Sequence, residues 1–211
     1  MPGDLEFKVA IIGAGKVGSG LARALAAKGH TILFGVRNPS SDKTRAALAL
    51  LRDKAVVTNI ADAIVYGDLI ILAVGWPDAA EIVRALAGQL KGKILIDTTN
   101  VFGDPTHEGR SGAEILAELA PEAQIVKCFN TLGAEHFTDP TFNGKPATMF
   151  LCGDDAEAKT FVGWLVSDMG FELVDAGPLS NAGALEAMGR LWVYLAKNGM
   201  GRDFAFKLVK K

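Results

Sequence analysis

A glycine-rich pattern near the start of the chain has the spacing of a phosphate-binding loop. Gly13, Gly15 and Gly18 fit G-x-G-x-x-G, after an apolar run and before a helical pattern. In that context the first glycine permits a sharp turn, the second lets the backbone approach a pyrophosphate, and the third lets the helix lie close to the strand. The amides and the dipole at the helix start favour an anion. The pattern predicts dinucleotide binding, with a purely structural glycine turn as the alternative.

The residues after the second apolar run indicate which dinucleotide binds. NAD-binding proteins place an acidic residue at this strand end, where it accepts hydrogen bonds from the ribose 2′-hydroxyl. Here the position holds Arg37, and a charge-assisted hydrogen bond to a 2′-phosphate is worth roughly 1.5–3 kcal/mol. The other residues predicted to bind the cofactor on this loop are Asn38, Ser40 and Lys43, with Ser41 as a further donor. The sequence therefore predicts NADP, unless Arg37 is a solvated loop residue or Asp42 pairs with it or with Lys43.

Residues after three later apolar runs are expected to border the same cofactor. The carboxyl ends of parallel strands face the ligand crevice of a doubly wound sheet. The residues predicted there are Ala73, Val74, Gly75, Trp76, Asn100 and Asn130. Trp76 either stacks on or walls off a planar ring, or it anchors the helix that follows. The polar residues 97–100 either hold the nicotinamide ribose or amide, or they form an Asx or Thr turn.

Acid–base groups near this crevice are few. His136 follows Asn130 closely enough to reach the crevice, so we predict a substrate site of Trp76, Asn130 and His136. His30 lies between a helix and a strand and is expected to be structural. Because the sequence shows neither a metal-ligand cluster nor a G-x-S-x-G elbow, no catalytic residue and no metal ligand are assigned. Hydride transfer between two redox cofactors fits this shortage, since it needs positioning more than proton transfer.

The elements that must position these residues alternate between strand and helix. The expected strands are 7–12, 31–34, 55–57, 69–74, 93–96 and 124–129, and the expected helices are 17–28, 44–53, 60–66, 79–90 and 113–119. Such alternation implies a parallel sheet with helices on both faces. The fold class predicted is α/β, a Rossmann-type doubly wound parallel sheet with a small C-terminal α/β extension.

The last third of the chain forms the extension. Its expected elements are a strand at 147–152, a helix at 156–169, a strand at 171–174 and a long helix through 185–195. Because no Pro-, Ser- or charge-rich linker precedes it, we predict an NADP-binding domain of residues 1–145 with a small region, 146–211, packed on it. The apolar face of the last helix, with Phe204, Phe206 and Leu208, predicts a homodimer, unless these residues cover the sheet.

Composition bounds the remaining possibilities. In 211 residues, 49% hydrophobic and 22% charged side chains exclude wholesale disorder, and a formal net charge of −2 argues against a broad nucleic-acid surface. The longest apolar run, 69–76, is too short for a membrane span, and the acidic start is unlike a signal peptide. We expect a cytoplasmic protein that binds neither nucleic acid nor membranes, with Cys128 and Cys152 as free buried thiols.

Several segments together resemble a known family. The chain is similar to NADP-dependent oxidoreductases that reduce or oxidise coenzyme F420, a deazaflavin, and to the related oxidoreductase domain of the STEAP metalloreductases. The resembling segments are 13–18, 35–39, 73–76, 97–100, 126–131, 175–181 and 198–201. The phrase at 175–181 is the most specific of them, because generic Rossmann proteins lack it.

The resemblance implies a role for each matching segment. Gly13, Gly15, Lys16 and Val17 would lie along the pyrophosphate, Arg37 would take the 2′-phosphate, and Val74–Trp76, Asn100 and Asn130 would surround the nicotinamide. The deazaflavin would lie against the nicotinamide, under the C-terminal portion. Ala14, Lys16, Val36 and the bulky Trp76 depart from the family pattern and could alter the acceptor pocket.

The expected activity is hydride transfer between NADP(H) and a small-molecule redox acceptor, either the deazaflavin or a flavin. One alternative is a flavin or ferric reductase using FMN or FAD, and another is a sensor that binds NADP without turnover. β-Hydroxyacid dehydrogenases and pyrroline-carboxylate reductases share the N-terminal pattern. They need a large helical second domain, whereas only about 60 residues follow Cys152.

Overall fold

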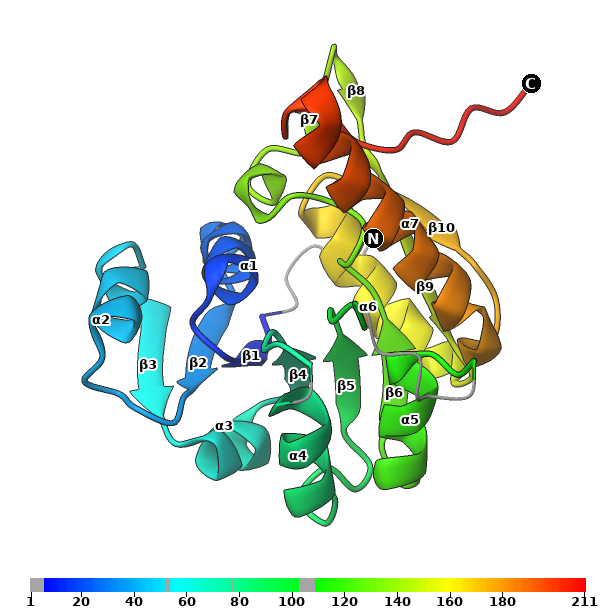
Figure 1. Cartoon of the computed structure of the whole chain (residues 1–211). Coiled ribbons are helices and arrows are strands. Elements are labelled where there is room, and N and C mark those ends of the chain that lie inside the picture. Colours follow the sequence, from blue (N-terminus) through cyan, green and yellow to red (C-terminus); the bar gives the residue numbers. More distant parts are fainter. Residues whose placement is uncertain (1–5, 52–53, 77, 103–108) are drawn as a thin grey trace.

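Eight strands form one sheet in a computed structural model of the chain (Figure 1). The structure describes residues 6–51, 54–76, 78–102 and 109–211. The strands are β1 (Lys8–Ile12), β2 (Thr31–Gly35), β3 (Ala55–Thr58), β4 (Leu69–Leu72), β5 (Ile94–Asp97), β6 (Gln124–Lys127), β9 (Thr148–Gly153) and β10 (Glu172–Asp175). Two short strands, β7 (Thr141–Phe142) and β8 (Lys145–Pro146), form a separate hairpin.

The strand order defines the fold class. It runs β10-β9-β6-β5-β4-β1-β2-β3, and every neighbouring pair is parallel except β6 with β9. The chain leaves β1 toward β2 and β3, then crosses back to β4 on the other side of β1. This reversal is the switch point at which doubly wound sheets bind ligands. The predicted Rossmann-type α/β class is confirmed.

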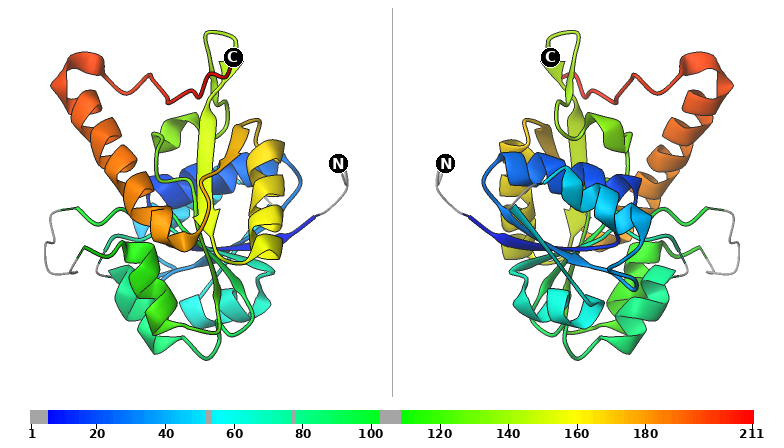
Figure 2. Two further views of the ribbon diagram at one scale, coloured as in Figure 1. Left: turned by 90° about the vertical axis from the view of Figure 1, so that its right-hand side faces the viewer. Right: turned by 90° about the vertical axis from the view of Figure 1, so that its left-hand side faces the viewer.

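Helices cover both faces of the sheet, which Figure 2 shows edge-on. They are α1 (Lys16–Ala27), α2 (Asp42–Ala49), α3 (Ile60–Tyr66), α4 (Asp78–Ala85), α5 (Gly112–Leu119), α6 (Ala156–Asp168) and α7 (Ala182–Leu195), with shorter turns η3 (Ala134–His136), η4 (Leu179–Asn181) and η5 (Ala196–Met200). α1, α2 and α6 pack on one face, and α3, α4, α5 and the start of α7 on the other.

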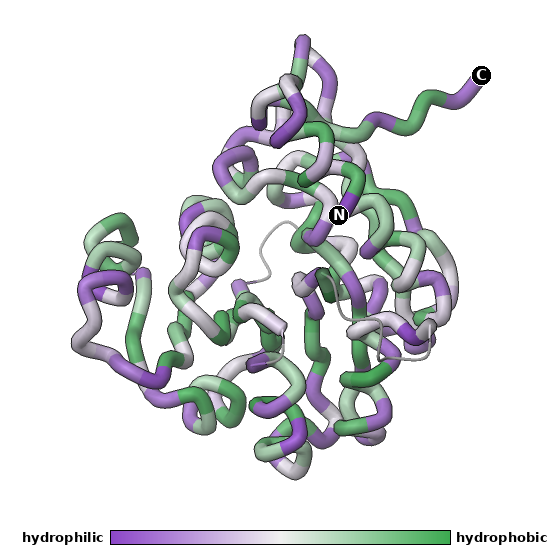
Figure 3. The backbone as a smooth tube through the Cα atoms, viewed as in Figure 1, coloured by the Kyte–Doolittle hydropathy of each residue, from purple (hydrophilic) through white to green (hydrophobic). Residues whose placement is uncertain are grey.

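Alternating burial explains why the central strands are apolar throughout. In β1, Val9 and Ile11 belong to the core under α1, whereas Ala10 and Ile12 belong to the core under α3 and α4. A strand covered on both faces loses the hydrophobic–polar alternation of a half-exposed strand. The central strands are accordingly mostly green in Figure 3. This two-sided burial fixes the carboxyl ends of the strands, from which the site residues project.

The structure shortens two predicted strands and adds a hairpin. β4 ends at Leu72 and β6 at Lys127, both short of the apolar runs that predicted them. Phe129 has a φ of 61°, which an extended strand cannot accommodate. The β7–β8 hairpin turns at Asn143 and Gly144, whose φ values are 49° and 73°. Asn-Gly is the usual sequence signal for such a two-residue turn, and this hairpin is an addition to the predicted elements.

The C-terminal extension continues the same sheet. β9 pairs antiparallel with β6, and β9, α6 and β10 form a parallel crossover unit. After α7 the chain returns to the sheet, where the Thr148 amide donates to the Phe206 carbonyl over 3.0 Å. Figure 2 shows α7 projecting from the body and the tail bridging back toward β8. The division of the chain at residue 145 stays a prediction.

Candidate functional site

A cavity of approximately 710 Å³ opens where β1, β2, β4 and β5 end. Most of the predicted cofactor residues line it. They are Gly13, Gly15, Lys16, Val17, Arg37, Asn38, Lys43, Ala73, Val74, Gly75, Trp76 and Asn100. Four other predicted residues, Gly18, Ser40, Asn130 and His136, are not among the described residues that line the cavity.

Each of the three loop positions favours glycine for a different structural reason. Gly13 has a φ of +105°, and its amide donates to the Gly35 carbonyl over 3.0 Å. A Cβ at Gly18 would lie 2.0 Å from the Gly13 carbonyl oxygen, so only glycine lets α1 start this close to β1. A Cβ at Gly15 would meet only the Lys43 side chain, at 3.5 Å. Gly15 caps α1 with an extended backbone, and its cavity side is open to an approaching group.

The part of the cavity beyond β2 carries two cationic side chains. Arg37 and Lys43 line it, and Ser41 caps α2 by accepting a hydrogen bond from the Thr44 amide. Ser40 does not face the cavity, and its carbonyl accepts a hydrogen bond from Arg45 over 2.8 Å. The loop therefore directs Ser41, rather than Ser40, toward the predicted 2′-phosphate position.

Arg37 is paired with an acidic residue that lies 41 positions later in the sequence, outside the predicted site. Its Nη2 lies 2.5 Å from Oδ2 of Asp78, the first residue of α4. Hydrogen bonding to this carboxylate raises the pKa of Arg37 above its ordinary value. Asp42, the alternative partner of Arg37 or Lys43, pairs with Arg45 instead. The Arg37 side chain is 63% exposed, and its role toward a 2′-phosphate stays a prediction.

Another part of the cavity is formed by strand-end residues of β4 and β5. The Thr98 hydroxyl donates to the Leu72 carbonyl over 2.9 Å, which ties the two strand ends together. Thr99 lines the cavity, and its buried Oγ1 has no hydrogen-bond partner within the described part of the chain. Trp76 also lines the cavity and lies against Gly112 at the start of α5. Trp76 thus faces the cavity and contacts α5 at once.

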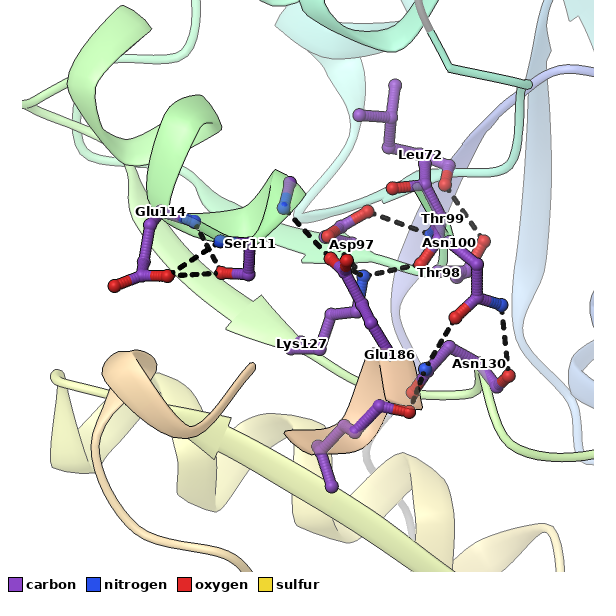
Figure 4. Close-up of polar contacts among 12 residues, drawn as sticks. Leu72, Asp97, Thr98, Thr99, Asn100, Ser111, Glu114, Lys127, Asn130 and Glu186 are labelled. Atoms are coloured by element: carbon purple, nitrogen blue, oxygen red, sulfur yellow. Dashed lines mark hydrogen bonds and ion pairs between the residues drawn. The ribbon is translucent and has the colours of Figure 1, made fainter. Parts of the chain in front are cut away.

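Asn130 acts on the cavity through Asn100. Its amide nitrogen donates to Asn100 Oδ1 over 2.9 Å and to the Leu185 carbonyl over 2.8 Å (Figure 4). Asn100 in turn donates to the Asn130 carbonyl over 3.2 Å. Asn100 lines the cavity, whereas Asn130 is buried behind it. This pair connects the cavity wall to α7.

A buried charged cluster lies beside these asparagines (Figure 4). Lys127 Nζ lies 2.8 Å from Asp97 Oδ2 and 3.2 Å from Glu186 Oε1. It also donates to the Thr99 carbonyl, and Glu186 accepts from the Gly112 amide over 2.9 Å. The cluster joins β5, β6, α5 and α7 at one point. A lysine within an apolar strand, at a position opposite Asp97 on its neighbour, is the sequence signal that could have indicated it.

His136 lies among C-terminal residues. Its Nε2 is 2.9 Å from the Arg202 carbonyl oxygen, and its ring packs against Phe142 with centroids 5.0 Å apart. Its predicted role in the substrate site stays a prediction. Across the described ranges, no three His, Cys, Asp or Glu side chains are grouped so as to hold a metal ion. No helix within those ranges is long and apolar enough to span a bilayer.

The fold and the phosphate loop are those of a dinucleotide-binding protein, and the comparisons narrow this class to the NADP-dependent oxidoreductases. The family model described as NADP oxidoreductase, coenzyme F420-dependent, matches residues 8–101. A solved structure from Arthrobacter sp. FB24, described as a candidate F420-dependent NADP reductase, superposes with a TM-score of 0.87 at 28% identity, over 97% of this chain and 100% of that one. Residues 8–101 belong to the coenzyme F420-dependent NADP oxidoreductase family, and the whole chain has the fold of the Arthrobacter protein.

Two curated relatives of different length are similar to this chain. The F420-dependent NADP reductase of Methanocaldococcus jannaschii is 27% identical over 90% of this chain and 92% of its own length. The metalloreductase STEAP3 of Rattus norvegicus is 34% identical over 86% of this chain. The present chain spans only 36% of that metalloreductase. Both the predicted family and the predicted relation to the STEAP proteins are confirmed.

Proposed function

We propose that this protein transfers hydride between NADP(H) and the deazaflavin coenzyme F420. The observation that carries the proposal is the cavity itself. It is lined by the glycine loop after β1, by Arg37 and Lys43 after β2, and by Trp76 and Asn100 after β4 and β5. The relative of nearly equal length is named for the same pair of reactants.

The residues of the cavity fit NADP. Gly15 leaves room at the start of α1 for a pyrophosphate, with Gly13, Lys16 and Val17 beside it and Gly18 supporting the turn. Arg37, Asn38 and Lys43 receive the 2′-phosphate, with Ser41 in place of Ser40 on the cavity side. Bound NADPH supplies the hydride.

The chain's own contribution to the chemistry is positioning. Ala73, Val74 and Gly75 form the wall beside Trp76, and Thr99 offers an unpartnered buried hydroxyl to a polar ring substituent. Asn130 holds Asn100 in place, and Trp76 and α5 exclude water from one side. These fixed polar groups would orient the nicotinamide and deazaflavin rings against each other. Hydride transfer between two cofactors requires this positioning and no proton donor from the protein.

The acceptor is identified by a parallel assay. Consumption of NADPH is followed by nicotinamide absorbance with F420, FMN and FAD offered separately, and NADH serves as the matched donor control. Turnover with F420 alone supports the proposal. Turnover with FMN or FAD favours a flavin or ferric reductase, and the STEAP relatives are named metalloreductases. Saturable NADPH binding without turnover on any acceptor favours a sensor.

We also propose that the protein is a cytoplasmic homodimer. Leu191 and Tyr194 on α7 are 47% and 62% exposed, which leaves an apolar surface on the projecting helix. Part of the expected apolar set is already covered, since Phe204 stacks on Trp192. Two free buried thiols fit a reducing compartment. Light scattering of the wild type and of Leu191→Glu tests the dimer, which the substituted chain should not form.

A further inference from the structure

The ion pair between Arg37 and Asp78 crosses the mouth of the cavity. Arg37 follows β2 and Asp78 begins the helix that follows β4, and β1 lies between these two strands. A contact between residues at these positions passes over the carboxyl end of β1, where the glycine loop turns. Both residues line the cavity. The carboxylate is therefore placed within the predicted nucleotide site, not behind it.

A bound anion can replace Asp78 as the partner of Arg37. The two side chains are 63% and 47% exposed, and exposed ion pairs of this kind are weak and screened by salt. A ribose 2′-phosphate carries up to about two negative charges and three acceptor oxygens. Such a group outcompetes one carboxylate for a guanidinium, but it must then bind beside that carboxylate. NAD carries no 2′-phosphate and meets neither the competition nor the repulsion.

We propose that Asp78 is a specificity-determining residue that competes with the 2′-phosphate for Arg37 and so weakens the binding of NADP(H) relative to NAD(H). This inference rests on the proposed function, because it assumes that Arg37 receives the 2′-phosphate. As a consequence, Arg37 would still select NADP(H), but Asp78 would make its release faster. Lys43, on the loop side of the cavity, forms no ion pair with a carboxylate among the described residues, so this cation stays available to the phosphate.

The test compares dissociation constants of NADP⁺ and NAD⁺ by calorimetry at one low salt concentration. Asp78→Asn keeps the size and the helix-start position of the side chain and removes its charge. We expect it to tighten NADP⁺ binding about fivefold, since exposed pairs are worth up to about that factor, and to change NAD⁺ binding less than twofold. Asp42→Asn is the matched control, because it removes one nearby exposed charge that pairs with Arg45. It should leave both constants within twofold.

The Arg37→Ala background separates this inference from the proposed function. In that background, Asp78→Asn should tighten NADP⁺ binding by at most about half the factor seen in the wild type, because no guanidinium is left to compete for. If Arg37→Ala itself leaves NADP⁺ binding unchanged, the assigned 2′-phosphate site fails. If Arg37→Ala weakens NADP⁺ binding but Asp78→Asn does not tighten it, the site stands and the competition is overturned. If Asp78→Asn weakens NAD⁺ binding, the Asp78 carboxylate accepts a hydrogen bond from the ribose 2′-hydroxyl. That result also overturns the proposed competition.

Discussion

The Lys127 ammonium lies 2.8 Å from the Asp97 carboxylate, and neither side chain is exposed to solvent. Glu186 from α7 completes the cluster, so one cation faces two carboxylates in the interior. Through Asp97 the cluster also fixes the strand end that carries Thr99, whose amide donates to Asp97 Oδ1 over 2.8 Å. The orientation of α7 and the shape of the cavity wall therefore depend on the same buried charges.

Removing the lysine of this cluster should strongly destabilise the fold. Lys127→Met leaves two buried carboxylates without their cation, and breaking a buried pair in this way costs about 3–5 kcal/mol. Glu186→Gln keeps an oxygen to accept the Gly112 amide and leaves Lys127 paired with Asp97, so its cost should be about 1 kcal/mol. Urea unfolding followed by circular dichroism measures both. Equal, small losses for the two variants would show that the cluster does not stabilise α7 on the sheet.

How much of this arrangement the sequence predicts depends on the range of the contacts. The glycine loop is made by one short segment, and its spacing alone indicates both the turn and the close start of α1. The strands are predicted from apolar runs because burial on both faces demands them. Their ends are less certain, since a positive φ at Phe129 has no local signal.

Contacts between distant segments escape this kind of prediction. Lys127 and Glu186 are 59 residues apart, and no period in the chain connects them. The sequence offers Asp42 as a neighbour for Arg37, but the fold brings Asp78 from beyond β4 instead. Asn130 follows β6 in the chain, but only the structure shows that its amide contacts Asn100 and α7.

Gly15 and Gly18 should respond differently to the same substitution. Gly18→Ala puts a methyl group 2.0 Å from the Gly13 carbonyl oxygen, so β1 and α1 must separate and the thermal midpoint should fall by several degrees. Gly15→Ala meets only the flexible Lys43 side chain and has a helix-compatible φ of −78°. It should fold normally but lose NADP⁺ affinity at least tenfold, because the methyl group occupies the side on which a pyrophosphate approaches. Undiminished affinity in Gly15→Ala would remove the pyrophosphate from this loop.

Arg37 should discriminate between the two nucleotides. Arg37→Ala removes a charge-assisted contact worth roughly 1.5–3 kcal/mol, so NADPH binding should weaken at least tenfold while NADH binding stays nearly unchanged. Fluorescence titration with each reduced nucleotide measures the difference. Lys16→Ala is the comparison, because a residue beside the pyrophosphate should affect both nucleotides alike. Equal losses for NADPH and NADH in Arg37→Ala would contradict its assignment to the 2′-phosphate.

The buried thiols should make stability fall at alkaline pH. Burial raises the pKa of Cys152 to about 12, and it raises the pKa of Cys128 further, whereas an unfolded thiol titrates near 8.5. Above that pH the unfolded chain releases a proton that the folded chain retains, so the thiol's contribution is fully present below about pH 8.5 and is lost as the pH rises.

The expected loss between pH 7 and pH 10 is about 2 kcal/mol for each thiol. Urea unfolding under reducing conditions at the two pH values should therefore show a smaller decrease for Cys152→Ala than for the wild type. Lysine and tyrosine titrations affect both chains alike and cancel in this comparison. If the two chains lose stability equally, the Cys152 thiol ionises as readily in the fold as in the unfolded chain, and the buried strand β9 is open to water at this position.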